Sequence, residues 1–329
     1  MKVAAIVTSP LQILLAKQIC EKLDYSNVEY TILVESSDPR LENLKKLAEY
    51  LHLTYSIKYF EDSYFKGKFK YVKLLCSIFN NNGFDIVIIG MYFCIFSHLI
   101  SLKYVKKSGK LIYIDDGTAT IELDSEDCYR LRMNSKKWYY VRLLLTLKRV
   151  DHRRYYTIFD NISSKHYDTE KYNPFSTNVN AQVQLKGIFI LGTNSSIYAN
   201  NFSPVMSMES FNSFIIKSIE LLKDKNQEEN IYYSPHGRDN STELLDYCRK
   251  NEIEILKSMY SVEIDYVLKG YYPKIIAGPS STALFTLKKI FPNSIVIDLL
   301  PMGFFHARPE RKDKESLIKE SQGIKTLTI

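Results

Sequence analysis

Residues 3–23, VAAIVTSPLQILLAKQICEKL, indicate the fold class. Val3 to Thr8 is a run of small and β-branched residues, which is typical of a buried strand in a parallel sheet. Leu11 to Leu23 is a predicted helix, and Ser9 and Pro10 suit its N-terminus. A strand that passes directly into a helix predicts the first half of a β-α-β unit.

The same alternation recurs along the rest of the chain. Further strands are predicted at short apolar runs: Tyr30–Glu35, Tyr55–Phe60, Asp85–Gly90, Leu111–Ile114, Gly187–Leu191, Ile231–Ser234, Ile275–Ala277 and Ile295–Ile297. At 329 residues the chain is long enough for two domains of about 150 residues each. We therefore predict an α/β fold of two similar halves that face each other across a cleft.

Changes in composition give the expected domain boundaries. The N-terminal domain is predicted at 1–155 and includes a basic amphipathic segment at 130–154. A polar crossover rich in turn residues covers 156–186, and the C-terminal domain covers 187–307. The charged remainder, 308–329, is expected to be a solvated helix and a loose tail.

Composition excludes several classes of protein. A hydrophobic content of 45% excludes a disordered chain, and a net charge of +7 is modest for this length. The five cysteines form no CxxC pair and are expected to be buried free thiols. The N-terminus lacks a signal-peptide pattern, and no apolar run approaches the ~18 residues of a membrane span. We expect a cytoplasmic protein.

The segment Arg130 to Arg154 mixes basic residues with Trp138, Tyr139, Tyr140 and several leucines. A basic amphipathic helix of this kind can lie at the inner face of an anionic membrane. It can equally pack against its own domain or against a second copy in a homodimer, and these interpretations stay open. No recognised nucleic-acid-binding motif accompanies the patch, so nucleic-acid binding is not expected.

An acidic pair follows the predicted strand at 111–114. In doubly wound sheets ligands bind beyond the carboxyl ends of the strands. Asp115, Asp116 and Gly117 occupy such a position, where a carboxylate can act as a general base on a substrate hydroxyl. Repulsion between the two acids is expected to raise a pKa, and an ordinary Asp-Gly turn is the alternative interpretation.

A histidine follows the predicted strand at 231–234 in the sequence Pro235-His236-Gly237-Arg238. In a loop at a strand end the imidazole can face a ligand instead of a core. Beside Arg238 it is suited to protonate a departing phosphate or to donate a hydrogen bond to it.

Two further loops carry hydroxyl and amide groups at strand ends. Ser280, Ser281 and Thr282 lie between a strand and a helix, where the helix N-terminus favours an anion. Simple N-capping by a serine is the alternative. Asn194 and Ser195, in the loop after Leu191, are expected to open into the same cleft.

Motifs of several enzyme classes do not occur. The chain contains no GxGxxG, GxxxxGK[ST], HExxH or GxSxG sequence, which argues against dehydrogenases, P-loop NTPases, zincins and α/β-hydrolases. No acidic triplet follows a predicted strand, so no metal cofactor is expected.

Six motifs together resemble a known family. They are TSPLQ at 8–12, IDDGT at 114–118, RRYYTIF at 153–159, LGTNS at 191–195, SPHGR at 234–238 and GPSSTALFTLKK at 278–289. In this order they resemble bacterial sialyltransferases of glycosyltransferase family 52, which include the lipooligosaccharide sialyltransferases. The resemblance implies a GT-B architecture of two Rossmann-like domains, with the acceptor on the N-terminal domain and the nucleotide on the C-terminal one.

The resemblance also implies roles for single residues. His236 would be the general acid or hydrogen-bond donor to the departing CMP phosphate, which Ser280 and Ser281 would hold. Glu263 matches a family glutamate that binds the nucleotide ribose, although by itself it could be an ordinary exposed helix acid. Arg238 would assist at the phosphate or meet the donor carboxylate.

The sequence departs from the family pattern at two places. Gly237 stands where the family usually has proline. The loop that carries an aspartate base in the lipooligosaccharide enzymes has no carboxylate here, so Asn194 and Ser195 would only position substrate. We therefore predict Asp116 as the base, as in sister families with an Asp-Asp-Gly motif. The family's basic apolar region, linked to dimer and membrane contact, falls at 130–154.

The expected activity is an inverting, metal-independent transfer of N-acetylneuraminic acid from CMP-sialic acid. The acceptor would be a terminal sugar, often galactose, of a lipid-linked, lipooligosaccharide or capsular glycan. A hexosyltransferase that uses a UDP-sugar is the main alternative because one fold serves many donors. A non-catalytic glycan-assembly protein is the other.

Overall fold

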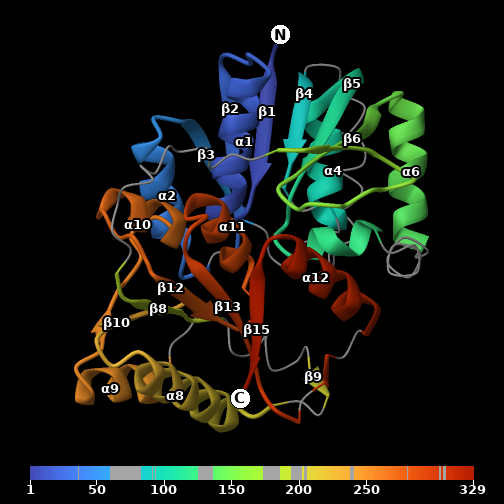
Figure 1. Cartoon of the computed structure of the whole chain (residues 1–329). Helices are drawn as coiled ribbons and strands as arrows, with labels where there is room; N and C mark the ends of the chain where they lie inside the picture. The colour runs from blue at the N-terminus through green and yellow to red at the C-terminus, as the bar shows by residue number, and fades with distance from the viewer. Residues whose placement is uncertain are drawn as a thin grey trace. The chain divides into compact units, whose positions relative to one another are not determined.

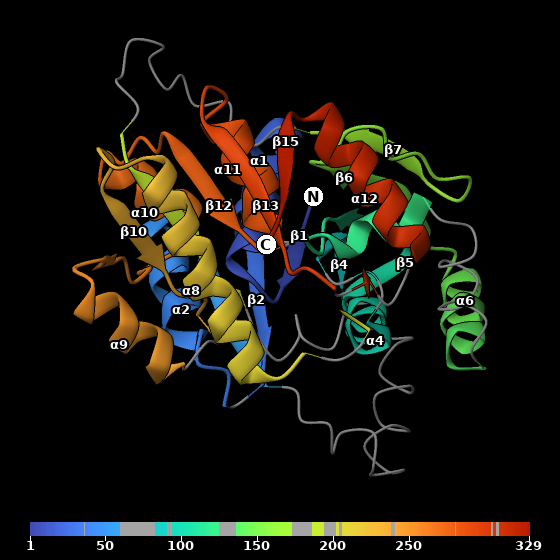
Figure 2. The ribbon, with the colours of Figure 1, turned by 60° about the horizontal axis from the view of Figure 1, so that its bottom comes forward.

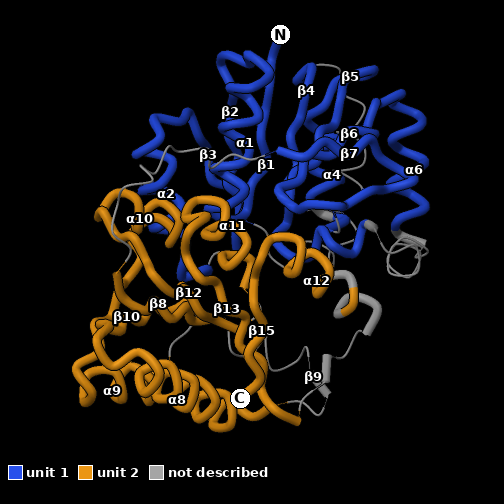
Figure 3. Tube along the Cα trace, in the orientation of Figure 1, with its two compact units in different colours: residues 1–174 blue, residues 175–329 orange. Residues whose placement is uncertain are grey.

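The computed structural model describes most of the chain (Figure 1). The described residues are 1–35, 37–59, 83–90, 92, 94–124, 136–172, 186–193, 202–203, 206–237, 241–279, 281–303, 305–306 and 309–329. The chain divides into two compact units, Met1–Pro174 and Phe175–Ile329 (Figure 3). Each unit is built around its own parallel sheet.

The first unit contains a seven-stranded sheet in the order β3-β2-β1-β4-β5-β6-β7, with every neighbouring pair parallel. Its strands are β1 (Val3–Val7), β2 (Val28–Val34), β3 (Thr54–Tyr59), β4 (Phe84–Ile89), β5 (Val105–Ile114), β6 (Asp151–Thr157) and β7 (Asp168–Lys171). Its helices are α1 (Pro10–Lys22), α2 (Leu41–Tyr50), α4 (Ile95–Tyr104), the 3₁₀ helix η2 (Ala119–Asp124) and α6 (Lys136–Lys148).

The predicted β-α-β beginning is confirmed. All five residues of β1 are buried, as expected for a central strand covered by helices on both faces. The Ser9 side chain accepts a hydrogen bond from the Gln12 backbone N–H, and Pro10 occupies the first turn of α1. Because β1 pairs with both β2 and β4, the strand order reverses beside β1, which makes this the topological switch point of the unit.

An aromatic cluster fills the part of the first unit between α4, α6 and the sheet. His98 on α4 is fully buried, and its ring centroid lies 4.8 Å from that of Trp138 and 5.5 Å from that of Tyr113. Its Nε2 lies 2.7 Å from the Tyr92 carbonyl oxygen, which can only accept, so this nitrogen carries a proton. Burial lowers the pKa of His98 to about 4.

Only one face of α6 is packed in this core. Trp138, Val141 and Leu145 are buried in the cluster. On the other face the apolar side chains are exposed: Tyr139 by 58%, Tyr140 by 55%, Leu143 by 41% and Leu147 by 54%. In the part of the chain that the structure describes, no helix has the length and apolar character needed to cross a membrane.

The second unit contains a six-stranded parallel sheet in the order β11-β10-β8-β12-β13-β15. Its strands are β8 (Ile188–Leu191), β10 (Ile231–Ser234), β11 (Glu254–Ile255), β12 (Ile275–Gly278), β13 (Ile295–Leu300) and β15 (Ile324–Thr328). Its helices are α8 (Met208–Lys225), α9 (Thr242–Lys250), α10 (Val262–Leu268), α11 (Thr282–Ile290) and α12 (Pro309–Ser321). A short antiparallel pair joins β9 (Phe202–Ser203) and β14 (Phe305–His306).

The two faces of the second sheet pack against different helices, as the figures show for α8 and α9 on one face and α10 and α11 on the other (Figures 1 and 2). Ile188 and Ile190 of β8 belong to a cluster with apolar residues of α8 and α9. Phe189 points the other way, and its ring lies 5.0 Å from that of Tyr266 on α10. This alternation is the pattern of a strand buried on both faces.

The units divide at different residues from those predicted. The first unit continues past residue 155, because β7 extends its sheet beside β6 within the expected crossover at 156–186. The second unit continues past residue 307, because β15 pairs with β13 where a loose tail was expected. Lys319 on α12 is buried beside Asp298 and Glu315, and two carboxylates compensate its desolvation.

The described cysteines agree with the expected free thiols. Cys20, Cys94 and Cys248 are unbridged, and Cys20 and Cys248 are buried. Burial raises the pKa of Cys20 to about 12 and that of Cys248 to about 11, which makes both thiols unreactive at neutral pH. Cys76 and Cys128 lie outside the described residues.

We expect His98 to make folding stability depend on pH. Its folded pKa lies below its unfolded value, so the unfolded chain binds the additional proton between pH 6.5 and about 4. Stability from this site is complete above that window and is lost as pH falls through it, by about 3 kcal/mol. Denaturant unfolding of wild type and His98→Gln from pH 8 to pH 4 measures this, and parallel stability curves would contradict it.

Candidate functional site

In the first unit, the carboxyl ends of β1, β4 and β5 bring together the groups that can do chemistry. Thr8 follows β1, Gly90 follows β4, and Asp115 and Asp116 follow β5. The three strands are parallel neighbours, so their ends lie at the same edge of the sheet. This edge contains the switch point at which open α/β sheets bind ligands.

The two neighbouring aspartates have different environments. Asp115 is fully buried, and its Oδ2 accepts a hydrogen bond of 2.6 Å from the Ile158 backbone N–H beyond β6. Burial raises the pKa of Asp115 to about 7, and the charge of Asp116 adds a smaller increase. The pKa of Asp115 is therefore raised, as expected. Burial is the main cause of this increase, and repulsion from Asp116 contributes less. Asp115 connects two strand ends inside the domain.

Asp116 is only partly buried and is held by a side chain of α1. Its Oδ1 lies 2.9 Å from Nε2 of Gln12, and its backbone N–H donates to Thr120 Oγ1 at 3.2 Å. Gly117 has a φ of +60°, a conformation that glycine adopts without strain. The predicted Asp-Gly turn is thus present, and the same turn presents the Asp116 carboxylate at the strand-end edge.

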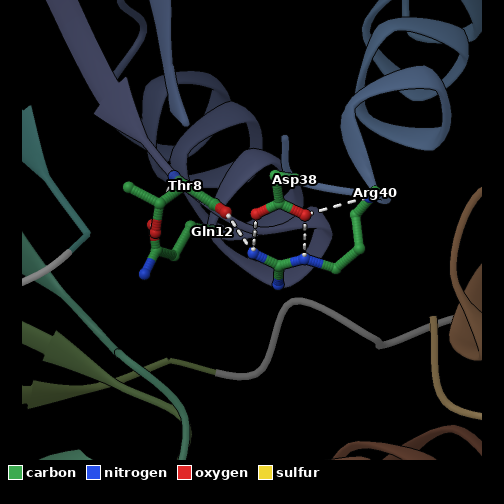
Figure 4. Close-up of polar contacts among 4 residues, drawn as sticks. All are labelled: Thr8, Gln12, Asp38 and Arg40. Atoms are coloured by element: carbon green, nitrogen blue, oxygen red, sulfur yellow. Dashed lines mark hydrogen bonds and ion pairs between the residues drawn. The ribbon is translucent and has the colours of Figure 1, made fainter. Parts of the chain in front are cut away.

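A charged pair lies close to the same edge. After β2, Arg40 donates through Nε and Nη2 to the two carboxylate oxygens of Asp38, at 3.1 and 2.8 Å. Nη2 also lies 3.4 Å from the Thr8 carbonyl oxygen (Figure 4). Individual roles for Asp38, Arg40 and Gln12 were not predicted from the sequence. Their signal is the segment in which they lie, because SSDPR and TSPLQ each connect a predicted strand to the helix that follows it.

In the second unit the ends of β8 and β10 are in close contact. Gly192 donates its backbone N–H to the Ser234 carbonyl oxygen at 2.7 Å. A Cβ at Gly192 would lie only 2.9 Å from the His236 backbone nitrogen and 3.1 Å from Cα of Pro235. Glycine is therefore required here for the loop that carries His236 to approach β8.

His236, between Pro235 and Gly237, lies directly after β10 and is partly buried. The strand before it is fixed from the helix side, because the Ser234 hydroxyl and the Tyr266 hydroxyl on α10 are 2.6 Å apart. The predicted position of His236 at a strand end is confirmed by the end of β10 at Ser234.

The predicted anion site at the start of α11 contains a helix cap. The Ser281 Oγ accepts a hydrogen bond of 3.3 Å from the Ala283 backbone N–H, and Thr282 is the first helical residue. The capping interpretation is therefore correct for Ser281. A capping hydroxyl still has its own proton to donate, so the cap is compatible with a phosphate at this N-terminus.

Glu263 is a buried residue rather than an exposed helix acid, with 7% of its surface exposed. Its Oε1 accepts a hydrogen bond of 2.8 Å from the Thr286 hydroxyl. This contact joins the first turn of α10 to α11, the helix that Ser281 caps. Glu263 thereby holds the middle of α11 against α10.

Some predicted site residues lie outside the described residues, namely Asn194, Ser195, Arg238 and Ser280. Within the described ranges, no three or more histidine, cysteine, aspartate or glutamate side chains are gathered as metal ligands.

Comparisons with solved structures identify the fold. A putative UDP-N-acetylglucosamine 2-epimerase from Listeria monocytogenes aligns with a TM-score of 0.55 and 12% identity, over 98% of this chain and 86% of that one. S. aureus MnaA in complex with UDP aligns with a TM-score of 0.57 and 12% identity, over 98% and 87%. An α/β-galactoside α-2,3-sialyltransferase from Photobacterium phosphoreum aligns with a TM-score of 0.48 and 12% identity, over 99% and 98%.

No family model and no curated protein sequence matches the chain. The structural likeness to the first two proteins, with TM-scores of 0.55 and 0.57, concerns the fold alone. Together with the two parallel sheets, it identifies a two-domain α/β fold of the GT-B type, as the sequence predicted.

We expect Asp115 to give a pH dependence opposite to that of His98. Its folded pKa is raised, so its contribution to stability is complete below pH 4 and is lost as pH rises to about 7. Wild type should therefore lose about 3 kcal/mol relative to Asp115→Asn between pH 4 and pH 7. Urea unfolding of both proteins across this range measures the difference, and a constant difference would contradict the burial of an ionisable carboxyl.

Proposed function

We propose that this protein is a glycosyltransferase that transfers sialic acid from a CMP-activated donor with inversion and without a metal ion. The observation that carries the proposal is the placement of the motif residues. Asp116 follows β5, His236 follows β10 and Ser281 caps α11 directly beyond β12. These strand ends are where parallel α/β sheets bind their ligands. The motif order that resembles family 52 supports membership of that family.

The reaction assigns Asp116 to the acceptor. Its carboxylate removes the proton of a sugar hydroxyl while the hydroxyl oxygen attacks the anomeric carbon of sialic acid. The new bond forms on the face opposite to the bond that breaks, so the anomeric configuration inverts. Asp115, buried and bound to the Ile158 N–H, supports the turn and does not contact the acceptor.

The residues of the second unit act on the donor. As the bond between the anomeric oxygen and the sugar breaks, the CMP phosphate gains negative charge. His236 donates a proton or a hydrogen bond to it, and the Ser280 and Ser281 hydroxyls with the α11 N-terminus stabilise it. Arg238 adds a positive charge, and Pro235, Gly237 and Thr282 shape the loops.

Glu263 is assigned to the donor nucleotide. We propose that its carboxylate accepts hydrogen bonds from the ribose hydroxyls while its Oε1 stays bound to Thr286. Asn194 and Ser195 are assigned to substrate positioning.

The exposed face of α6 supports a peripheral contact with a membrane that carries the glycan acceptor. Tyr139, Tyr140, Leu143 and Leu147 are exposed, and Arg142 on the same helix is exposed as well. Aromatic and aliphatic side chains beside a cation suit the headgroup region of an anionic bilayer. Burial of the same face against a second copy of the chain is the alternative.

The activity is tested by measuring CMP release from CMP-N-acetylneuraminate in EDTA, with lactose or N-acetyllactosamine as acceptor. Wild type should release CMP in an acceptor-dependent way. His236→Ala and Asp116→Asn should each lower the rate by about 10²- to 10⁴-fold, the range of general acid-base catalysis. The exposed residues His166 and Asp224 provide matched controls, and His166→Ala and Asp224→Asn should retain the wild-type rate.

Three outcomes would overturn the proposal. The absence of CMP release, together with no effect of CMP on the melting temperature, excludes a CMP-sialic acid donor. Release of UDP from a UDP-sugar under the same conditions would identify a hexosyltransferase of the same fold. If the double variant Asp116→Asn/His236→Ala were fully competent in the cell, the protein would be a non-catalytic assembly factor.

A further inference from the structure

Gln12 on α1 is a buried amide whose hydrogen bonds are all accounted for. Only 1% of its surface is exposed. Its Oε1 accepts from the Thr8 backbone N–H at 2.7 Å and from the Thr8 hydroxyl at 3.0 Å. Its Nε2 donates to the Gly90 carbonyl oxygen and to Asp116 Oδ1, both at 2.9 Å. Two accepted and two donated bonds are the full capacity of an amide side chain.

Backbone groups fix the orientation of this amide. The Thr8 N–H can only donate, so the amide oxygen must face it. The Gly90 carbonyl can only accept, so the amide nitrogen must face that side. With both directions set by the ends of β1 and β4, the remaining N–H of Gln12 points at Asp116.

The local sequence alone would favour a different contact for this side chain. Ser9-Pro10-Leu11-Gln12 has the spacing of a capping box, in which the glutamine would turn back to the N-cap backbone N–H. The Ser9 hydroxyl makes its half of that box by accepting the Gln12 backbone N–H at 3.3 Å. The Gln12 side chain instead reaches across the strand ends to Asp116. Departures from local rules of this kind occur where function requires them.

Gly90 provides the space for this contact. A Cβ at position 90 would lie 2.3 Å from both Cδ and Oε1 of Gln12, closer than any real contact. Any other residue at this buried position would displace the amide. Arg40 contacts the Thr8 carbonyl oxygen, and Asp38 neutralises the charge of Arg40 (Figure 4). The contact with Thr8 holds the end of β1 in place.

We propose that Gln12 is a positioning residue for the catalytic carboxylate of Asp116, an inference that rests on the proposed role of Asp116 as the base. The Gln12 N–H aims the carboxylate and favours its ionised form, because hydrogen bonds donated to a carboxylate stabilise the charge. Gly90 is also required for this contact, because its lack of a side chain leaves room for the Gln12 amide between the strand ends.

The first test is the pH profile of kcat/KM with CMP-N-acetylneuraminate for wild type, Gln12→Met and Gln12→Glu. Gln12→Met removes the donor with little change in shape and should move the acidic limb up by about one pH unit. Gln12→Glu places a like charge beside Asp116 and should move it further. In both variants kcat should fall by about tenfold or more, with little change in the acceptor KM, because the lost contact acts on the base.

Gln18 provides a matched control on the same helix, and Gln18→Met should keep the wild-type profile. If the acidic limbs of both Gln12 variants coincide with that of Gln18→Met, while Asp116→Asn is inactive, the positioning role is overturned and the proposed function stands.

A second measurement is independent of activity. Melting temperatures of wild type, Gln12→Met, Asp116→Asn and the double variant at pH 8 form a double-mutant cycle. If Gln12 holds the Asp116 carboxylate, the double variant should melt above the temperature expected from the sum of the two single shifts. Additive shifts would overturn the inference. Should wild type show no transferase activity, this cycle alone decides whether Gln12 holds Asp116.

Discussion

All neighbouring strands of the two main sheets pair in parallel. The carboxyl ends of the strands in each sheet therefore lie at one edge of that sheet. The ends of central strands then crowd together, and glycine is needed where neighbouring atoms leave no room for a Cβ. A Cβ at Gly90 would meet the Gln12 side chain, and one at Gly192 would meet the loop of His236. At Gly278 it would lie 2.9 Å from Cβ of Leu191. Close packing of strand ends is therefore what positions the candidate site in each unit.

The two adjacent aspartates after β5 lie in different environments at this edge of the sheet. Successive residues beyond a strand point in different directions, so Asp115 enters the core toward β6 while Asp116 turns toward α1. The first carboxyl is desolvated, which raises its pKa to about 7, so it is only partly ionised near pH 7 and repulsion between the pair is reduced. The second is partly exposed and keeps a donated hydrogen bond, as a carboxylate that works as a base requires.

Much of the fold could be predicted from the sequence because central parallel strands are continuous apolar runs. The predicted strand at Ile231–Ser234 is β10, and β1, β4 and β12 differ from prediction by a residue at their ends. The strands β7, DTEK, and β15, IKTLT, were not predicted. Both are polar edge strands whose existence depends on pairing with β6 or β13 rather than on their own hydrophobicity. The two compact units extend past the predicted domain limits at residues 155 and 307 for the same reason.

The positions of Asp116, His236 and Ser281 could be predicted because each follows a predicted strand, which is where α/β sheets bind ligands. The contact of Gln12 with Asp116 could not be predicted, since the residues are 104 positions apart and meet only through the strand order. Glu263 illustrates the same limit: its sequence is compatible with an exposed helix, and only the packing of α10 on α11 buries it.

Amide hydrogen exchange with and without saturating CMP can locate nucleotide binding residue by residue, and it is the measurement to make first. If the strand ends of the second unit bind the nucleotide, exchange should slow at His236 and Gly237 and in the first turn of α11, with little change in α6. Slower exchange elsewhere in the chain, with these segments unchanged by CMP, would contradict the assignment of the strand ends of the second unit as the nucleotide site.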